Sequence, residues 1–228
     1  MKKDLYRVLY DLQDRVLELV FSEASGFYLT GGTALGRFYL NHRYSDDLDF
    51  FSHDLHAFPE IFRLLHDRLL ERWSGVSLEV DARDFKRIRI IADGATLKLD
   101  FVADRVSRIG LPVRIQNVYV DTVRNILSNK ICAVLGRDEG RDIADLVWIA
   151  RKRRFTWPDI LEDAQKKELF EPEDFCYRIS SFPIELLDTV PFIDVLDRVG
   201  FEAALQGIKD DVEHRDVNHE ALIDAIDL

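Results

Sequence analysis

The chain has 228 residues, of which 47% are apolar, and its 31 basic and 42 acidic side chains give a formal net charge of −11. This length and composition suffice to bury one domain or two small ones, and they exclude disordered and fibrous classes. The negative charge argues against a general nucleic-acid-binding surface, and two cysteines exclude a disulfide framework, so we expect a cytoplasmic protein with reduced thiols.

The first twenty residues predict an amphipathic helix. Apolar side chains recur there at helical spacing, at Leu5, Val8, Leu9, Leu12, Val16, Leu19 and Val20. Acidic and basic residues interrupt this series. We therefore expect a helix that packs on the core, not a signal peptide or a membrane span.

A glycine turn follows the next apolar segment. Residues 27–30 are typical of a short strand, and Gly31 and Gly32 come directly after it. Glycines lack Cβ atoms and let a ligand approach the backbone. Residues 33–40 are compatible with a helix, whose buried side we expect to include Leu35, Phe38 and Tyr39. The amino end of that helix would point at the glycines, an arrangement that favours phosphate.

Two acids stand on the strand predicted after this helix. In Asp47-Leu48-Asp49-Phe50 the two-residue period of a strand places both carboxylates on one face and the apolar side chains on the other. Two close carboxylates are stable in their charged form when a divalent cation or a basic group neutralises them. Magnesium, with manganese as the alternative, suits oxygen ligands and keeps open positions for substrate phosphates.

Asp100 is the candidate for a third acid. Residues 86–91 and 97–101 read as two strands, and Asp93-Gly94 between them is a strong signal for a tight hairpin. Asp100 therefore lies within a sheet, where we expect it beside the acid-bearing strand. Three carboxylates in this arrangement are typical of a site in which two metal ions flank a transferred phosphoryl group.

The next helix carries a lysine that has two interpretations. Asp121 resembles a helix cap, and apolar residues from Val123 to Val134 follow at helical spacing, with Lys130 at the border of the apolar side. Lys130 either extends its ammonium into water or contacts a triphosphate. Asp142 and Asp145 share a face of the following helix; they form a solvated acidic surface, or they orient Lys130, an arginine or the nucleotide.

Taken together, these motifs resemble the nucleotidyltransferases of the AbiEii/AbiGii toxin group, within the polymerase-β-like superfamily. The opening motif of that group corresponds to Gly31-Gly32-Thr33 and to Arg43-Tyr44-Ser45-Asp46-Asp47-Leu48-Asp49. Its strand acid, helical lysine and basic-Asp-x-x-Asp motif correspond to Asp100, Lys130 and Arg141-Asp142-Ile143-Ala144-Asp145. The motifs span residues 29 to about 150.

The resemblance implies roles for these residues. Those implied as catalytic are Asp47, Asp49, Asp100, Lys130 and Asp145, the first three as metal ligands. Those implied to bind the nucleotide are Gly31, Gly32, Thr33, Arg43, Ser45, Lys130 and Asp142. For Lys130 the resemblance favours triphosphate contact.

The fold class expected is α/β (α+β), with a polymerase-β-like core and a mixed sheet. We expect the nucleotidyltransferase core in residues 1–115 and a helical C-terminal domain in residues 116–228. Pro158 and Pro172 each stand where a first-turn proline would begin a further helix.

The function expected is metal-dependent transfer of a nucleoside monophosphate from a nucleoside triphosphate to an acceptor hydroxyl. The resemblance implies a toxin with a partner antitoxin, and for some relatives the acceptor looks to be the 3′ end of transfer RNA. The alternatives are modification of a protein hydroxyl and a nucleotide-binding module without turnover.

An RNA acceptor would require a local basic patch. One candidate patch surrounds the predicted hairpin and comprises Arg83, Lys86, Arg87 and Arg89. The other is the basic run of residues 151–154, followed by Phe155 and Trp157, which either binds a strand or complements a helix dipole.

Overall fold

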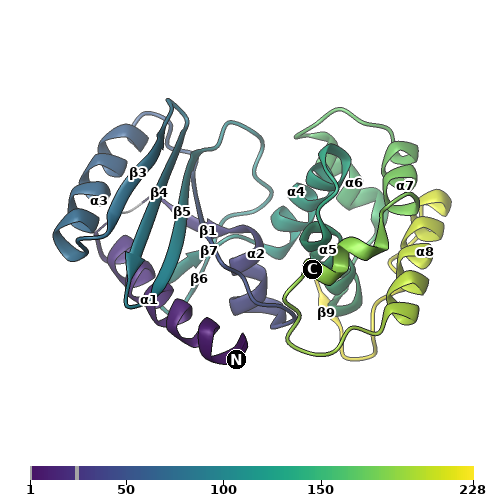
Figure 1. Ribbon diagram of the computed structural model, residues 1–228. Coiled ribbons are helices and arrows are strands. Elements are labelled where there is room, and N and C mark those ends of the chain that lie inside the picture. Colours follow the sequence, from purple (N-terminus) through teal and green to yellow (C-terminus); the bar gives the residue numbers. More distant parts are fainter. Residues whose placement is uncertain (1, 24–25) are drawn as a thin grey trace. The chain divides into compact units, whose positions relative to one another are not determined.

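The computed structural model describes residues 2–23 and 26–228 and divides into two compact units (Figure 1). The first unit comprises Met1–Ala34, Tyr44–Arg105 and Pro112–Asp121; the second comprises Leu35–Arg43, Val106–Leu111 and Thr122–Leu228. Each unit is thus built from separate stretches of chain, whereas the sequence suggests one boundary after residue 115. The difference arises because two short segments, 35–43 and 106–111, pack with the helical unit.

The described residues of the first unit form a mixed sheet of seven strands (Figure 1). The strand order is β3-β4-β5-β2-β1-β7-β6, with parallel pairing of β2 with β5 and of β1 with β7. The strands are β1 (Tyr28–Thr30), β2 (Leu48–Ser52), β3 (Val76–Asp81), β4 (Phe85–Ala92), β5 (Ala95–Ala103), β6 (Val113–Ile115) and β7 (Val118–Val120). This confirms the mixed sheet and the α/β class.

The helices of the first unit are α1 (Lys2–Glu23), α2 (Gly31–Ala34) and α3 (Phe58–Arg72). Of these, α1 and α3 pack on the same face of the sheet. Phe21 of α1 contacts Phe50, and Phe62 of α3 contacts Phe101. Phe50 and Phe101 stack on each other on the same face of the sheet. The predicted amphipathic helix is confirmed in α1, which buries Leu9, Leu12, Val16 and Val20 but leaves Leu5 exposed. Within the described residues, no helix is long and apolar enough to cross a membrane.

The hairpin of β4 and β5 follows the sequence prediction. Asp93 and Gly94 at its turn both have positive φ angles, 53° and 80°, as a two-residue turn of this kind requires. Counting outward from this turn places Arg87 of β4 directly opposite Asp100 of β5. The hairpin therefore fixes which basic side chain lies beside the predicted third acid.

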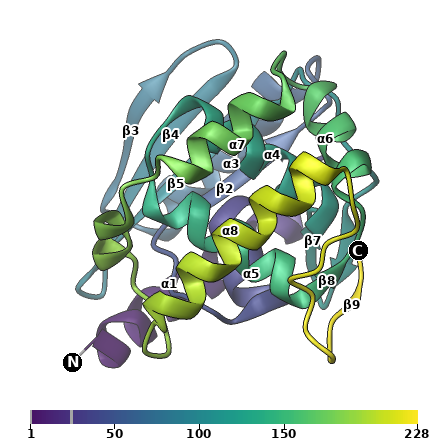
Figure 2. The ribbon, with the colours of Figure 1, turned by 90° about the vertical axis from the view of Figure 1, so that its right-hand side faces the viewer.

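The second unit is mostly helical, and α7 packs against α8 in it (Figure 2). Its elements are η1 (a π-helix, Leu35–Leu40), α4 (Val123–Gly136), α5 (Gly140–Lys152), β8 (Arg153–Arg154), α6 (Trp157–Gln165), α7 (Pro172–Ser180), η2 (a 3₁₀ helix, Ile184–Thr189), α8 (Arg198–His214) and β9 (Ile226–Asp227). The prolines at 158 and 172 stand in the first turns of α6 and α7, as predicted.

Two local predictions are wrong. Asp121 does not cap α4; the cap is Thr122, whose hydroxyl accepts a hydrogen bond from the backbone N–H of Asn125 at 3.1 Å. Phe38 and Tyr39 are only half-buried. The reason is that the helix becomes a π-helix after Ala34, which changes the side that each later residue faces.

Candidate functional site

Asp49 and Asp100 are direct neighbours in the sheet. They pair in register across the parallel strands β2 and β5, so their side chains leave the same face. The alternating residues Leu48 and Phe50 are fully buried on the opposite, helix-covered face. Asp47 lies just before β2, two residues from Asp49, and by the strand period belongs to the same side as the other two acids. The sheet thus brings the three predicted acids to one face.

Gly31 makes room for the carboxylate of Asp49. Its φ angle is +69°, and a Cβ atom on it would lie 2.7 Å from Oδ2 of Asp49. The hydroxyl of Thr33 donates a hydrogen bond to the backbone oxygen of Asp47. Gly31 and Gly32 are already part of α2, so the helix begins two residues earlier than predicted. The expected phosphate contact of Gly31, Gly32 and Thr33 stays a prediction.

Basic side chains neutralise two of the acids. Arg87 binds both oxygens of Asp100 through one edge of its guanidinium group, with Nε 2.7 Å from Oδ1 and Nη2 2.8 Å from Oδ2. Lys98, on the same strand as Asp100, places Nζ 2.7 Å from Oδ2 of Asp47. Across the described ranges, no three Asp, Glu, His or Cys side chains form a ready metal-binding group. The acids are therefore aligned by the sheet but held by counter-ions.

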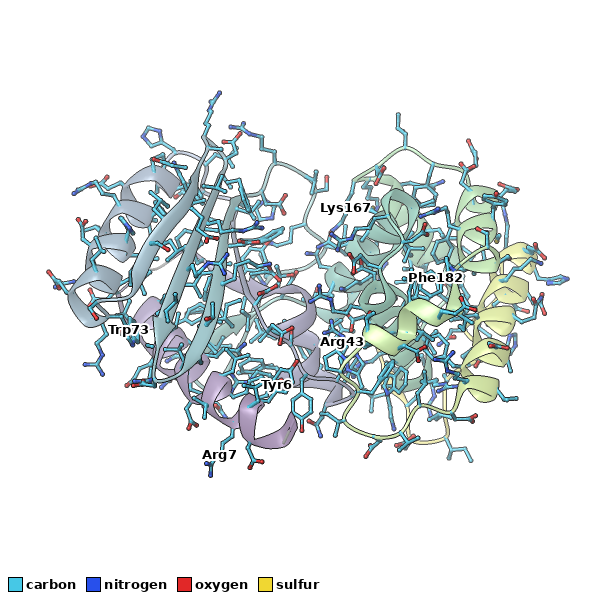
Figure 3. The ribbon with its side chains drawn as sticks, in the orientation of Figure 1. Tyr6, Arg7, Arg43, Trp73, Lys167 and Phe182 are labelled. Atoms are coloured by element: carbon cyan, nitrogen blue, oxygen red, sulfur yellow. The ribbon has the colours of Figure 1, made fainter. Side chains whose placement is uncertain are left out.

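Helix α1 holds the segment that leads into the acids. The ring of Tyr44 stacks on that of Tyr6, which is labelled in Figure 3, at 4.1 Å between centroids. The hydroxyl of Tyr10 accepts from the backbone N–H of Ser45 at 3.1 Å, and the amide of Gln13 donates to the backbone oxygen of Ser45 at 3.0 Å. These contacts from α1 fix the backbone at Tyr44 and Ser45, within the Arg-x-Ser-x-Asp-x-Asp motif.

In the second unit, Asp145 is the centre of a buried ionic cluster. Arg43, labelled in Figure 3, donates to it twice, from Nε and Nη2 at 2.7 Å each. The ammonium of Lys130 lies 2.6 Å from its Oδ2, and Nε2 of His42 lies 2.8 Å from its Oδ1. Asp142 is the second acid of the cluster, 2.7 Å from Lys130 Nζ. Lys130 is therefore not a lysine whose ammonium extends into water, and Asp142 and Asp145 are not a solvated acidic face.

Close backbone approaches position Arg43 for this cluster. The N–H of Asn41 bonds the oxygen of Gly36, five residues earlier, which ends the π-helix. A Cβ atom on Gly36 would lie 2.8 Å from the backbone oxygen of Arg43, so the chain folds back tightly only because this residue is glycine. Arg43 then forms an isolated β-bridge with Phe192.

The acidic and basic groups of the cluster stay charged because each charge stabilises the opposite charges buried beside it. Burial raises the pKa of Asp145, but the positive charges of Lys130 and Arg43 outweigh it and hold that pKa well below its ordinary value. Burial lowers the pKa of Lys130, and Asp145 and Asp142 reverse this, so its pKa is raised. Asp142, which also accepts from Arg137 at 2.8 Å, has a lowered pKa because its basic neighbours outweigh its burial.

His42 is the neutral member of the cluster. Burial lowers its pKa, and the hydrogen bond to Asp145 opposes that effect only in part. Because a carboxylate only accepts hydrogen bonds, the proton of the neutral ring is on Nε2. Nδ1 is buried and has no hydrogen-bond partner within residues 2–23 and 26–228. Protonation at Nδ1 would therefore place a buried N–H donor where it has no acceptor.

Sequence reasoning missed several of these residues. Arg87 and Lys98 were open to prediction, since the hairpin turn and the strand period place them on the acid face. Tyr6, Tyr10 and His42 gave no local signal, because their partners are far away in the sequence. The catalytic roles predicted for Lys130 and Asp145 stay predictions. So do the nucleotide-binding roles predicted for Arg43, Ser45, Lys130 and Asp142.

The two basic patches are largely engaged within the protein. Around the hairpin, Lys86 pairs with Asp81 and Arg89 with Glu79, in addition to the pair of Arg87 with Asp100. In the second patch, Trp157 is fully buried, so it is not open to stack on a nucleotide strand. Of the two aromatic residues predicted for the second patch, only Phe155, which is half-buried, is partly open to solvent.

The acids fit a divalent cation by their chemistry. Asp49 and Asp100 present hard oxygen donors from adjacent strands, and Gly31 leaves space for one of them. Asp47 and Asp100 would first have to give up Lys98 and Arg87. The sheet accordingly provides the ligand set, and rearrangement of two long side chains would open it.

Comparisons with known proteins agree with this geometry. Residues 15–223 match the family model described as nucleotidyl transferase AbiEii toxin, type IV toxin–antitoxin system. An uncharacterised protein of Aquifex aeolicus (strain VF5) is 28% identical over 199 residues, covering 85% of this chain and 87% of that protein.

Two solved structures share the fold. JHP933 from Helicobacter pylori aligns with a TM-score of 0.64 at 19% identity, over 92% of this chain and 94% of that one. The nucleotidyltransferase toxin MenT4 of Mycobacterium tuberculosis H37Rv aligns with a TM-score of 0.57 at 16% identity, over 91% and 84%. Because the family model covers nearly the whole sequence, the chain belongs to the AbiEii family of toxins and is a nucleotidyltransferase.

Proposed function

We propose that the acid face of the first unit binds magnesium or manganese through Asp47, Asp49 and Asp100 and transfers a nucleoside monophosphate to the 3′ end of an RNA, with transfer RNA as the acceptor. The family generally uses divalent ions, a nucleoside triphosphate and a partner antitoxin. The observation that carries the proposal is the register of Asp49 beside Asp100, which places both carboxylates on one face of the sheet.

The reaction is a displacement at the α-phosphorus. The acceptor hydroxyl forms a bond to this phosphorus, the bond to the bridging oxygen breaks, and pyrophosphate leaves. Bound divalent ions would neutralise the triphosphate charge. Asp100 is the candidate to take the proton of the hydroxyl, because it is set deepest among the acids, with 11% of its side chain exposed. Catalysis then depends mainly on positioning and charge neutralisation.

The contacts of the motif segment support this role. Thr33 and helix α1 both hold the backbone around Ser45 and Asp47, so the acids stand on a rigid base and not on a loose loop. Rigid placement matters because catalytic groups that shift by about 1 Å lose much of their effect.

The test uses each labelled nucleoside triphosphate with magnesium, total RNA and cell protein. We expect label on RNA with the parent protein and background label with the double variant Asp47→Asn, Asp49→Asn. Asp46→Asn, a substitution of the same type in the same segment, is the matched control and should keep the parent's activity. Label on protein would transfer the proposal to a protein hydroxyl, and label on neither would indicate a nucleotide-binding module. Full labelling by the double variant would refute the metal site.

A further inference from the structure

The pair of Arg87 and Asp100 has a geometry that bears on how the acid face takes up a cation. The guanidinium fork engages both oxygens of the carboxylate, at 2.7 and 2.8 Å. Both residues lie directly opposite each other on adjacent strands. Such bidentate pairs are among the stronger ion pairs, and they fix geometry as well as charge. A divalent cation that binds Asp100 must therefore compete with the Arg87 guanidinium for both carboxylate oxygens of Asp100.

The two partners differ in their freedom to move. Asp100 sits in the middle of β5 with a short side chain that is 11% exposed, whereas the long side chain of Arg87 is 33% exposed. The guanidinium of Arg87 also lies over the ring of Phe85, at 5.2 Å from its centroid. Release of the pair therefore takes rotation of the Arg87 side chain, at the cost of its contact with Phe85, while the strand keeps Asp100 beside Asp49.

A divalent ion adds two positive charges to a face whose acids Asp47 and Asp100 already have basic partners, Lys98 and Arg87. The added charge repels the guanidinium from Asp100. The same change attracts a triphosphate, whose oxygens suit the planar fork of an arginine.

We propose that Arg87 is the exchangeable counter-ion of the metal site: a divalent cation displaces it from Asp100, and the released guanidinium binds the triphosphate. The inference rests on the proposed function, because it needs a metal at Asp100. Arg87 thus lowers the affinity for the metal alone and raises the affinity for the metal together with the polyphosphate. This opposite effect on two ligands separates it from a purely structural ion pair.

The first measurement is Mn²⁺ binding by titration calorimetry, without nucleotide. We expect Arg87→Gln to bind Mn²⁺ about tenfold more tightly than the parent, since the competing charge-assisted hydrogen bonds are gone. Arg89→Gln is the matched control, because Arg89 is on the same strand and face but pairs with Glu79. It should change the affinity less than about twofold, because exposed charges interact weakly. Equal or weaker Mn²⁺ binding by Arg87→Gln would overturn the proposal.

The second measurement uses the preformed complex of Mn²⁺ with inorganic triphosphate, which carries no base. We expect Arg87→Gln to bind this complex about tenfold more weakly than the parent, through loss of a bidentate phosphate contact. Arg87→Lys, which keeps the charge and loses the fork, should fall between the two. Unchanged binding of the complex by Arg87→Gln would refute the phosphate role.

The outcomes also separate this inference from the proposed function. If the parent binds Mn²⁺ and labels its acceptor, but Arg87→Gln binds the ion no better, only the role of Arg87 fails. If neither the parent nor any variant binds Mn²⁺, the metal site fails, and the exchange with it. Circular dichroism spectra that match the parent establish that each variant is folded.

Discussion

The substitution Asp145→Asn removes the charge at the centre of the buried cluster without changing the size of the side chain. Asp145 is fully buried and accepts hydrogen bonds from His42 and Arg43, with the ammonium of Lys130 2.6 Å away. Arg43 is itself only 2% exposed. After the substitution, Lys130 would keep Asp142, Arg43 would lose the carboxylate that it now contacts twice, and the new amide N–H groups would face other donors.

The expected loss of stability follows from this burial. Breaking a buried ion pair by removing one partner costs about 3–5 kcal/mol, because the remaining charge stays out of water and uncompensated. The direction of the pKa values agrees, since Lys130 and Arg43 hold the pKa of Asp145 well below its ordinary value. We expect the free energy of unfolding of the second unit to fall by about 3–5 kcal/mol.

Urea denaturation followed by tryptophan fluorescence measures this loss. In a Trp73→Phe background the remaining tryptophans, Trp148 and Trp157, both belong to the second unit. Their signal then reports the unfolding of that unit without a contribution from the first. Coincident transitions by fluorescence and circular dichroism would establish that a single free energy describes this unfolding.

The matched control is Asp188→Asn. Asp188 pairs with Arg198 in the same unit, but their side chains are 68% and 40% exposed. Exposed pairs contribute little, so the midpoint should hardly move. A loss below about 1 kcal/mol for Asp145→Asn, a value typical of exposed pairs, would refute the reasoning that this cluster is a buried ionic core.

Three further outcomes are expected in urea denaturation followed by circular dichroism, which reports the unfolding of both units. Gly31→Ala should lower the free energy of unfolding more than Gly94→Ala. Both positions have a positive φ angle, which costs an alanine roughly 1–2 kcal/mol, but only at Gly31 would the new Cβ meet Asp49. Equal losses at the two positions would contradict this. His42 has a lowered pKa through burial, so the unfolded chain takes up its proton more readily, and stability falls as the pH drops below about 6.5. His42→Gln should flatten this dependence; parallel pH profiles would argue against it. Thr122→Ala should lower the free energy of unfolding by about 1 kcal/mol, because the helix α4 loses its capping hydroxyl. An unchanged free energy would show that the Thr122 side chain does not stabilise the start of α4.

Local patterns predicted the elements that carry the acids. The Asp93-Gly94 turn, the alternation around Asp100 and the first-turn prolines each depend on neighbouring residues, and the structure has them as expected. The turn also determines a partner: residues equally far from it face each other, which pairs Arg87 with Asp100. That contact was readable from the sequence by counting.

Contacts between distant segments were not readable in this way. The parallel pairing of β2 with β5 aligns Asp49 with Asp100 across about fifty residues, and no local preference specifies that register. His42 and Asp145 are 103 residues apart, and a lone histidine in a polar segment gives no sign of burial. The prediction of which side chains are buried in the helix after Gly31 was wrong for a different reason. A change to π-helical bonding depends on packing and not on the propensity of residues 35–40.

Exposure distinguishes two kinds of ion pair in this chain. Asp145 and its partner Lys130 have side chains that are 0% and 10% exposed, and opening their pair would leave charges out of water. The ammonium of Lys130 has three N–H donors, and its two carboxylates take two, so a phosphate contact by Lys130 would add to these pairs and not replace them. The pair of Lys98 and Asp47, at 30% and 26% exposure, can instead open to water at little cost. The proposed ligand exchange is therefore assigned to the acid face of the sheet, whereas the buried cluster holds Arg43 and Lys130 in place.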